Sequence, residues 1–378
     1  MDLDDARPTL DEGVPATPII FHPIPQCTLT LSSRWESSDG GAICSGWAGS
    51  SIKFYSHNLL SGVYMRIGHK TQRKDRWNGG TPMLSVSVMS RTQDSRSSAD
   101  RIQTRTLDAE PGTTVQLWEE PIKDCFVEIV LVDWASILEI DGFMTAHPEG
   151  IKPISTVHPQ ILFIGDSITC GLALERSDGG QPIPRGMLDA FPSQALAMLR
   201  ETQSYNLCLN VLAYPGILLV GNNVPDVDEF AGSGPSGMVD RFFHSNPWDT
   251  TAWSPSGNPE FICIALGTND EANDVSPDAF RMTLERFIRR LSTTFPSVKA
   301  FYVIPPFRDF SETDAGAIHR DLVSRPLAIA ELDIRTCVDI NSEMAVEHTV
   351  DGLHPTVAGH ACLAENLVRF LSTHRPLP

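Results

Sequence analysis

The sequence predicts a two-domain protein in which an all-β sandwich over residues 21–150 precedes an α/β domain with a parallel sheet over residues 158–378. Three observations lead to this prediction. The chain has 378 residues, more than the roughly 100–200 residues of a typical domain. Short segments with alternating polar and apolar residues fill the first part, as in β-sandwiches. Longer apolar runs alternate with helical patterns in the second part, which is typical of βαβ units.

The β domain is expected to follow an acidic, proline-containing arm at residues 1–20, which we expect to be mobile. Stretches rich in β-branched residues then recur between Gly, Asn and Ser clusters, and this spacing favours a sandwich or jelly roll. The segment 147–159 contains three prolines and one glycine, so we place the domain boundary there. Examples of the strands predicted in this domain are 27–32, 51–56, 62–68, 83–88 and 126–132.

The α/β domain is predicted from five apolar runs of strand length and three segments with apolar residues at helical spacing. Pro326 interrupts the segment 315–332, so the helix between the last two strands is weakly defined. The predicted strands are 161–165, 207–213, 261–267, 300–305 and 336–340, and the predicted helices are 194–201, 278–291 and 357–371.

The charge of the chain argues against two classes of partner. With 29 basic and 47 acidic side chains, the formal net charge is −18. This charge repels phosphate backbones and anionic lipids, so we expect neither a nucleic-acid nor a membrane partner. No apolar run approaches the ~20 residues of a membrane span. The acidic start lacks the apolar core of a signal peptide, which predicts a cytoplasmic protein unless a leader has been removed.

Eight cysteines lie far apart, without a CxxC pair or any other metal-ligand spacing. Isolated cysteines within apolar stretches behave as small hydrophobic residues. We therefore interpret them as buried free thiols in a reducing compartment, and we expect no metal site.

Polar residues follow three of the predicted strands, at the edge where parallel sheets collect their reactive groups. Ser167 comes directly after the first strand, Gly216 after the second and Asn269 after the third. Each of these residues alone has an ordinary interpretation, because serine caps helices while glycine and asparagine occupy turns. Their hydroxyl, amide N–H and side-chain amide are also the groups that an acyl-transfer site requires.

A fourth block, Asp351-Gly-Leu-His354-Pro, stands immediately before the last predicted helix. An aspartate three residues before a histidine can accept a hydrogen bond from one ring nitrogen, which leaves the other nitrogen basic toward a hydroxyl. The four blocks occur in one chain, in this order and at strand ends. Together they indicate a nucleophilic site rather than four unrelated turns.

These blocks resemble those of the SGNH (GDSL) hydrolase superfamily, over roughly residues 158–378. The four marker residues of that superfamily match Ser167, Gly216, Asn269 and His354, and Asp351 stands at its third triad position. The resemblance implies a flavodoxin-like domain whose five parallel strands have the order 2-1-3-4-5. It also implies that Ser167 is the nucleophile and that the Ser167 and Gly216 amides and the Asn269 side chain form the oxyanion hole. No cofactor is implied.

The sequence ILFIGDSITCG at 161–171, together with SGWAGSSIKFYS at 45–56, is similar to the family-two carbohydrate esterases. Those enzymes join a jelly roll to an SGNH domain and remove acetyl groups from polysaccharides. The resemblance therefore implies a serine esterase that hydrolyses a short acyl ester, acetyl above all, of a carbohydrate or another hydroxylated small molecule.

Two other functions remain open at this point. An acyltransferase of secondary metabolism would use the same Ser-His-Asp site and pass the acyl group to an alcohol. A carbohydrate-binding or interaction protein would use the β domain alone, although the complete set of site residues argues against this. The residues do not predict the oligomeric state.

Several further features receive a structural or a peripheral interpretation. We expect Phe307 and Arg308 to lie at the substrate rim, because they follow the fourth strand, and the polar insertion 172–184 to contribute to specificity. The Gly-rich segment 232–237 does not follow a strand and is predicted to be a loop. Packing roles are expected for the remaining residues considered, which are Trp248, Trp253, Cys170, His348 and His360.

Overall fold

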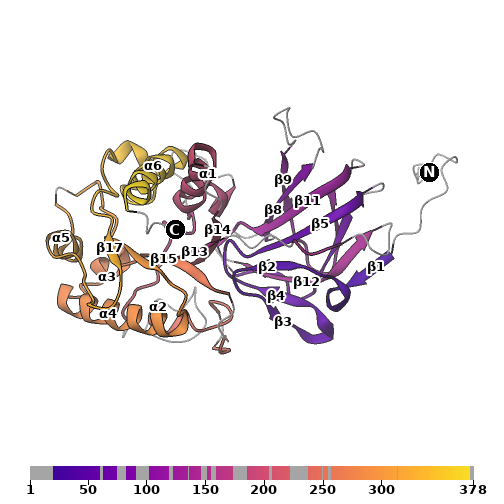
Figure 1. The fold of residues 1–378 in the computed structure, drawn as a ribbon, viewed down its shortest axis with the longest axis horizontal. Helices are drawn as coiled ribbons and strands as arrows, with labels where there is room; N and C mark the ends of the chain where they lie inside the picture. Colours follow the sequence, from indigo (N-terminus) through magenta and orange to yellow (C-terminus); the bar gives the residue numbers. More distant parts are fainter. Residues whose placement is uncertain are drawn as a thin grey trace, which may run out of the picture.

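The computed structural model consists of an N-terminal β lobe and a C-terminal α/β lobe (Figure 1). The expected arm at 1–20 falls almost entirely outside the described residues, as do most of the insertion 172–184 and most of the Gly-rich segment 232–237. The structure describes residues 20–59, 63–74, 82–90, 102–118, 122–134, 136–145, 151–154, 159–172, 185–203, 207–221, 237–248, 250–253, 257–312 and 314–374.

The β lobe contains two antiparallel sheets that face each other. One has the order β10 (Thr114–Trp118), β6 (Val63–Ile67), β12 (Ser136–Thr145), β4 (Ile43–Ser45) and β3 (Glu36–Ser37), with β1 (Ile20–Pro23) and β7 (Gln72–Arg73) also paired to β12. The other has the order β2 (Thr30–Ser32), β5 (Ser51–Leu59), β11 (Ile122–Leu131), β8 (Met83–Ser90) and β9 (Ile102–Asp108).

The period of two in these strands buries one face of each sheet. Ile52 and Phe54 of β5 are fully buried, and so are Val127 and Ile129 of the paired β11. Side chains of a strand alternate between the two faces of the sheet, so such a pattern directs every second residue into a shared core. The all-β sandwich predicted for this part of the chain is confirmed.

The long strand β12 lies outside the examples given from the sequence, and a bulge interrupts its alternation. Its pairing with β6 shifts register between Ile140 and Gly142, so the apolar side chains that enter the core are Leu138, Ile140 and then Phe143. An extra residue in one strand breaks the alternation on which a sequence-based prediction relies.

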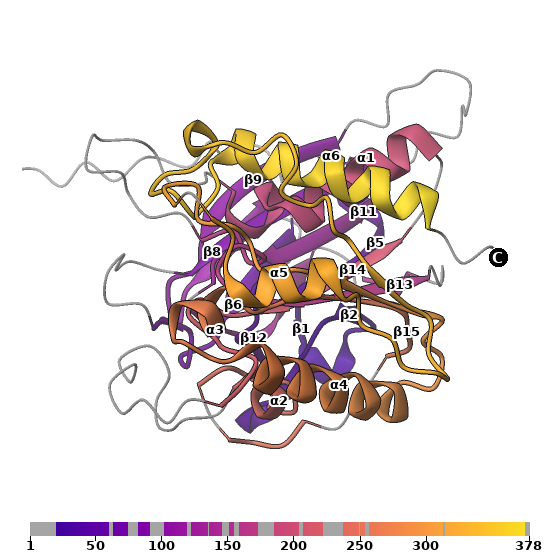
Figure 2. The same cartoon turned by 90° about the vertical axis from the view of Figure 1, so that its left-hand side faces the viewer.

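The α/β lobe is built on a five-stranded parallel sheet with the order β14-β13-β15-β16-β17. In chain order this is 2-1-3-4-5, as the resemblance implies. The helices cover both faces: α1 and α6 lie on one, and α2, α4 and α5 on the other (Figure 2). The elements are β13 (Gln160–Gly165), α1 (Phe191–Gln203), β14 (Cys208–Ala213), α2 (Met238–Arg241), β15 (Pro259–Ala265), α3 (Thr268–Ala272), α4 (Pro277–Thr294), β16 (Ala300–Ile304), α5 (Ala317–Ser324), β17 (Ile334–Thr336) and α6 (Val357–Thr373).

The last strand departs from its predicted position. The expected strand 336–340 overlaps β17 at one residue, because β17 pairs with β16 only from Ile334 to Thr336. Cys337 directly follows β17 and Ile340 lies in the next turn, and both are buried in the apolar cluster under α6. Their apolar character therefore reflects burial of a turn and not a continuing strand. The helix α5 ends at Ser324, ahead of Pro326.

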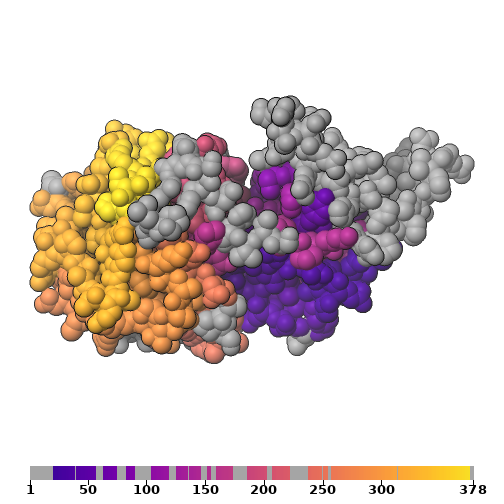
Figure 3. Space-filling view, viewed as in Figure 1, coloured from indigo at the N-terminus to yellow at the C-terminus, as the bar shows by residue number. Residues whose placement is uncertain are grey.

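The two lobes lie against each other (Figure 3). They share apolar clusters in their interior. Val132 and Trp134 of the β lobe belong to the same cluster as the residues of α1 and α6. Trp47 is 0% exposed within the cluster on the opposite face of the sheet, and its Nε1 donates to the Ser245 carbonyl at 2.9 Å. The Met187 amide also donates to the Val132 carbonyl at 3.0 Å.

Candidate active site

Ser167 lies on a tight turn directly beyond the carboxyl end of β13. The carboxylate of Asp166 accepts a hydrogen bond from the Ile168 amide at 3.1 Å, and the Asp166 carbonyl accepts from the Cys170 amide at 3.1 Å. These bonds fix the turn, so Asp166 has the capping role that aspartate commonly takes at such positions. Ser167 is 6% exposed, and its Oγ lies 3.0 Å from Nε2 of His354.

His354 reaches Ser167 from a loop that precedes α6 by only a few residues. Its Nδ1 lies 2.7 Å from the Asp351 carboxylate, whose other oxygen accepts from the His354 and Leu353 amides at 2.7 and 3.0 Å. The loop is closed by a hydrogen bond from the Val350 amide to the His354 carbonyl at 2.8 Å. Serine, histidine and aspartate thus form one continuous hydrogen-bonded row.

The environment of Asp351 keeps its carboxylate charged. Partial burial raises its pKa, but the hydrogen bonds from the His354 ring and from the His354 and Leu353 amides outweigh this effect and lower the pKa to about 2. An aspartate that stays ionised at neutral pH can hold the imidazole in one tautomer and stabilise the imidazolium that forms when His354 takes a proton.

The second and third strand ends bring two amide donors to the same edge. Gly216 follows β14 with φ of 72°, a conformation that glycine adopts without strain. Asn269 lies in the first turn of α3, and its Nδ2 donates to the Ile217 carbonyl at 3.1 Å. This bond uses one of the two amide hydrogens of Asn269 and ties α3 to the Gly216 turn. The second hydrogen of the Asn269 side-chain amide is not used by this bond and can donate to another acceptor.

Asp270 is a positioning residue that the sequence reasoning did not single out. Its carboxylate accepts from the Leu219 and Val220 amides at 2.9 and 3.0 Å, so it anchors the loop that begins at Gly216. Burial raises its pKa to about 6, while these hydrogen bonds and its own backbone amide act in the opposite direction. In the sequence Gly267-Thr-Asn-Asp270, its position directly after Asn269 is the signal that could have identified it, but a turn aspartate has the same local pattern.

His360 lies near the triad but has a different environment. It is 0% exposed, and its Nδ1 accepts from the amide of Phe191, the first residue of α1. Burial and, to a smaller degree, the nearby charge of His354 together lower its pKa to about 3. At neutral pH His360 is therefore uncharged, and the described hydrogen bond of the Ser167 hydroxyl is with His354.

The two residues expected at the substrate rim differ in position. Phe307 is only 4% exposed and lies in the core, where its ring packs edge-on to that of Phe191 with centroids 5.7 Å apart. The expectation for Phe307 is therefore corrected, because contact with α1 draws the side chain inward. Arg308 is half-buried, and its guanidinium lies 5.8 Å from the ring centroid of Phe310.

The remaining residues have the packing positions expected for them. Trp248 and Trp253 pack against the apolar cluster beneath α2 and α4, while Cys170 is fully buried, which raises the pKa of its thiol. His348 accepts from the Ala345 amide through its ring. Within the described ranges, no three His, Cys, Asp or Glu side chains are grouped as metal ligands, and no helix combines the length and apolar character of a membrane span.

The model of the GDSL-like lipase/acylhydrolase family matches residues 163–362 of the sequence. The chain belongs to this family. The matched range begins within β13 and ends within α6, so it contains all of the site residues described above. No curated protein matches the sequence significantly.

Solved structures extend the likeness of this GDSL-like hydrolase to both lobes. A family-two carbohydrate esterase from Cellvibrio japonicus superposes with a TM-score of 0.68 at 17% identity, covering 94% of this chain and 98% of that one. A family-two esterase from Clostridium thermocellum in complex with cellohexaose gives 0.64 at 16% identity, with 91% and 98% covered. The salicylyl-acyltransferase SsfX3 from a tetracycline biosynthetic pathway gives 0.64 at 14% identity, with 97% and 99% covered.

At these identities the likeness establishes the fold alone, a β sandwich joined to an α/β domain with a parallel sheet. The family match and the fold together make the protein an SGNH serine hydrolase.

Proposed function

We propose that the protein is an esterase that removes a short acyl group, acetyl above all, from a carbohydrate or another hydroxylated small molecule. The observation that carries the proposal is the row Asp351–His354–Ser167, with contacts of 2.7 and 3.0 Å. In this proposal the two domains are residues 21–150 and 158–378, and the second contains the complete catalytic set.

The first half-reaction transfers the acyl group to the protein. His354 Nε2 takes the proton from Ser167 Oγ as this oxygen attacks the ester carbonyl, and Asp351 stabilises the resulting imidazolium. His354 then returns the proton to the leaving alcohol, and the C–O bond of the ester breaks. In the second half-reaction His354 deprotonates a water molecule that attacks the acyl-enzyme. The acid is released and Ser167 regains its proton.

The charge on the tetrahedral intermediate would be met by three donors, namely the amides of Ser167 and Gly216 and the side chain of Asn269. Neither backbone amide donates to an acceptor in the described part of the chain. The Gly216 turn and Asn269 are joined through the Ile217 carbonyl, so both donors are positioned before substrate arrives. Donors that are fixed in advance stabilise a developing oxyanion most strongly.

The choice of an acetylated carbohydrate rests on the likeness to family-two carbohydrate esterases across both lobes, one of them solved with cellohexaose. A similar likeness to an acyltransferase covers 97% of this chain, so transfer of the acyl group to an alcohol is the second candidate. Both functions use the same acyl-enzyme, and they differ only in the group that attacks it.

The test combines ester turnover with product analysis. Wild type should hydrolyse p-nitrophenyl acetate with a burst of p-nitrophenol, and Ser167→Ala and His354→Ala should each lower kcat by about 10³-fold or more. His374→Ala, which changes an exposed histidine at the end of α6, is the matched control and should keep full activity.

Acetylated sugars and longer acyl esters, each with and without an added alcohol acceptor, then distinguish the candidates. Release of free acetate supports the esterase, whereas a new ester of the added alcohol supports acyl transfer. Turnover that survives in Ser167→Ala would refute the nucleophile assignment, and absence of turnover in wild type on every ester would favour a binding protein.

A further inference from the structure

A buried arginine without a carboxylate partner lies where the two lobes meet. Arg34 extends from the β lobe, between β2 and β3, and is only 2% exposed. Its Nη1 donates to the His244 carbonyl at 2.6 Å. Its Nε and Nη2 are also buried, yet neither donates to any residue that the structure describes. Burial of a charged group without such partners is costly, because the charge loses its hydration.

The guanidinium is held by aromatic rings rather than by acidic groups. It lies 3.9 Å from the ring centroid of Trp253 and 4.5 Å from that of Phe242. Contacts of this kind stabilise a cation through the ring face, but they do not satisfy its N–H donors. The rings therefore fix the orientation of Arg34 and leave its Nε and Nη2 without an acceptor among the described residues.

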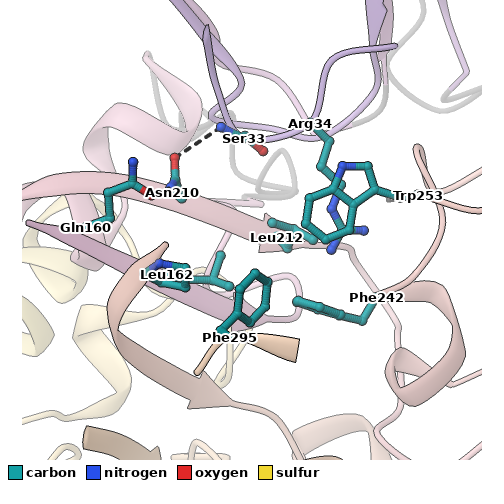
Figure 4. A pocket seen from close by; sticks show the side chains of 10 residues that line it. Ser33, Arg34, Gln160, Leu162, Asn210, Leu212, Phe242, Trp253 and Phe295 are labelled. Atoms are coloured by element: carbon teal, nitrogen blue, oxygen red, sulfur yellow. Dashed lines mark hydrogen bonds between the residues drawn. The ribbon is translucent and has the colours of Figure 1, made fainter. Parts of the chain in front are cut away.

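Arg34 lines a cavity, with Trp253 on the same side and Asn210 and Gln160 on the other (Figure 4). The Ser33 amide donates to Asn210 Oδ1 at 3.1 Å, and Asn210 Nδ2 donates to Gln160 at 3.2 Å, so this polar wall is ordered. The cavity leaves about 30 Å³ for the centres of water-sized molecules, whereas one water needs roughly 10–15 Å³. The space suits a ligand of very few non-hydrogen atoms.

The cavity is separate from the catalytic site. Gln160 is the first residue of β13, whereas Ser167 follows the last residue of that strand. The strand alone separates the two positions by about 17 Å, at roughly 3.3 Å per residue. A ligand beside Arg34 would therefore not contact the triad.

We propose that this cavity binds a small carboxylate, of the size of formate or acetate, through two parallel hydrogen bonds from Arg34. The Nε–H and one Nη2–H lie on the same edge of the guanidinium, and this edge matches the two oxygens of a carboxylate. The bound anion neutralises the buried charge and supplies both missing acceptors. Because Arg34 belongs to one lobe and most of the wall to the other, binding also strengthens the contact between the lobes.

The experiment measures the melting temperature of the full chain in sodium acetate, sodium formate and sodium chloride at equal ionic strength. A site of millimolar affinity raises the melting temperature by about 1–3 °C at 100 mM acetate or formate relative to chloride. Arg34→Met, which keeps an unbranched apolar stem between the rings, should lose this difference. Arg34→Lys should reduce it at least about fivefold, because an ammonium group cannot form the parallel pair.

Arg290→Met is the matched control, since Arg290 also stacks on a ring, that of Phe243 at 3.5 Å, and donates to a carbonyl, but on the exposed surface. It should keep the carboxylate effect. Equal melting temperatures in acetate and chloride for wild type would overturn the proposal. So would an acetate effect that survives in Arg34→Met, because binding would then lie elsewhere, the catalytic site included.

Discussion

Replacing the buried His360 should change how the stability of the protein depends on pH. The folded structure holds the pKa of His360 at about 3 through burial and the nearby charge of His354, whereas an unfolded histidine titrates near 6.5. Because the folded value is the lower one, the full contribution to stability is present above about pH 6.5. It is lost as the pH falls toward 3, since only the unfolded chain takes up the proton.

The magnitude follows from the difference in pKa. Between these two pH values the single histidine changes the free energy of unfolding by about 1.4 kcal/mol per pH unit, which amounts to about 2 kcal/mol at pH 5. Asp166 and Asp270 act in the opposite direction between about pH 4 and 6, because burial raises the pKa of each to about 6. They are common to wild type and variant, so their effect cancels in the comparison.

The assay is urea unfolding of wild type and His360→Asn at pH 7.5 and pH 5, followed by tryptophan fluorescence. Asparagine keeps an acceptor for the Phe191 amide, which His360 Nδ1 satisfies at 3.2 Å, but cannot take up a proton. The stability advantage of wild type over the variant should be about 2 kcal/mol smaller at pH 5 than at pH 7.5. A difference that stays within about 0.5 kcal/mol between the two pH values would refute the reasoning, because it would mean that folded His360 protonates as readily as the unfolded residue.

Three further predictions follow from the site, the contact between the lobes and the thiols. With p-nitrophenyl acetate as substrate, Asn269→Ala should lower kcat by about 10²–10³-fold with a smaller effect on KM, because the Asn269 amide acts on charge that exists only in the transition state. A change in KM alone would show that Asn269 binds the substrate in its ground state. In chemical denaturation, Trp47→Ala should lower the free energy of unfolding by about 3–5 kcal/mol. Trp47→Phe should lower it by only about 1–2 kcal/mol, through loss of the hydrogen bond to Ser245. Equal losses in the two variants would contradict the packing role of the ring. All eight cysteines are free, so denatured, unreduced protein should take up eight equivalents of iodoacetamide, and a deficit by an even number would indicate disulfides.

The sequence alone was sufficient to predict that a β lobe precedes an α/β lobe and to predict the family to which the chain belongs. Apolar runs of strand length and helical periodicity are local patterns, and the parallel sheet β14-β13-β15-β16-β17 appears where they predicted it, apart from the shift at β17. The site motifs were also predictable, because parallel strands bring their carboxyl ends to one edge whatever the loops between them do. The row Asp351–His354–Ser167 has the hydrogen bonds expected from the motifs, because Asp351 and His354 share one short loop.

Tertiary structure decided the features that depend on partners distant in the chain. The bulge in β12 is visible only from its pairing with β6, and Phe307 is drawn into the core by a helix that lies more than a hundred residues before it. Asp270 acquires its role from two amides of another loop. Arg34, which the sequence analysis does not single out, is a buried cation because aromatic rings of the other lobe pack against it. Burial and hydrogen-bond partners are properties of contacts between segments, so the residues flanking each position do not specify them.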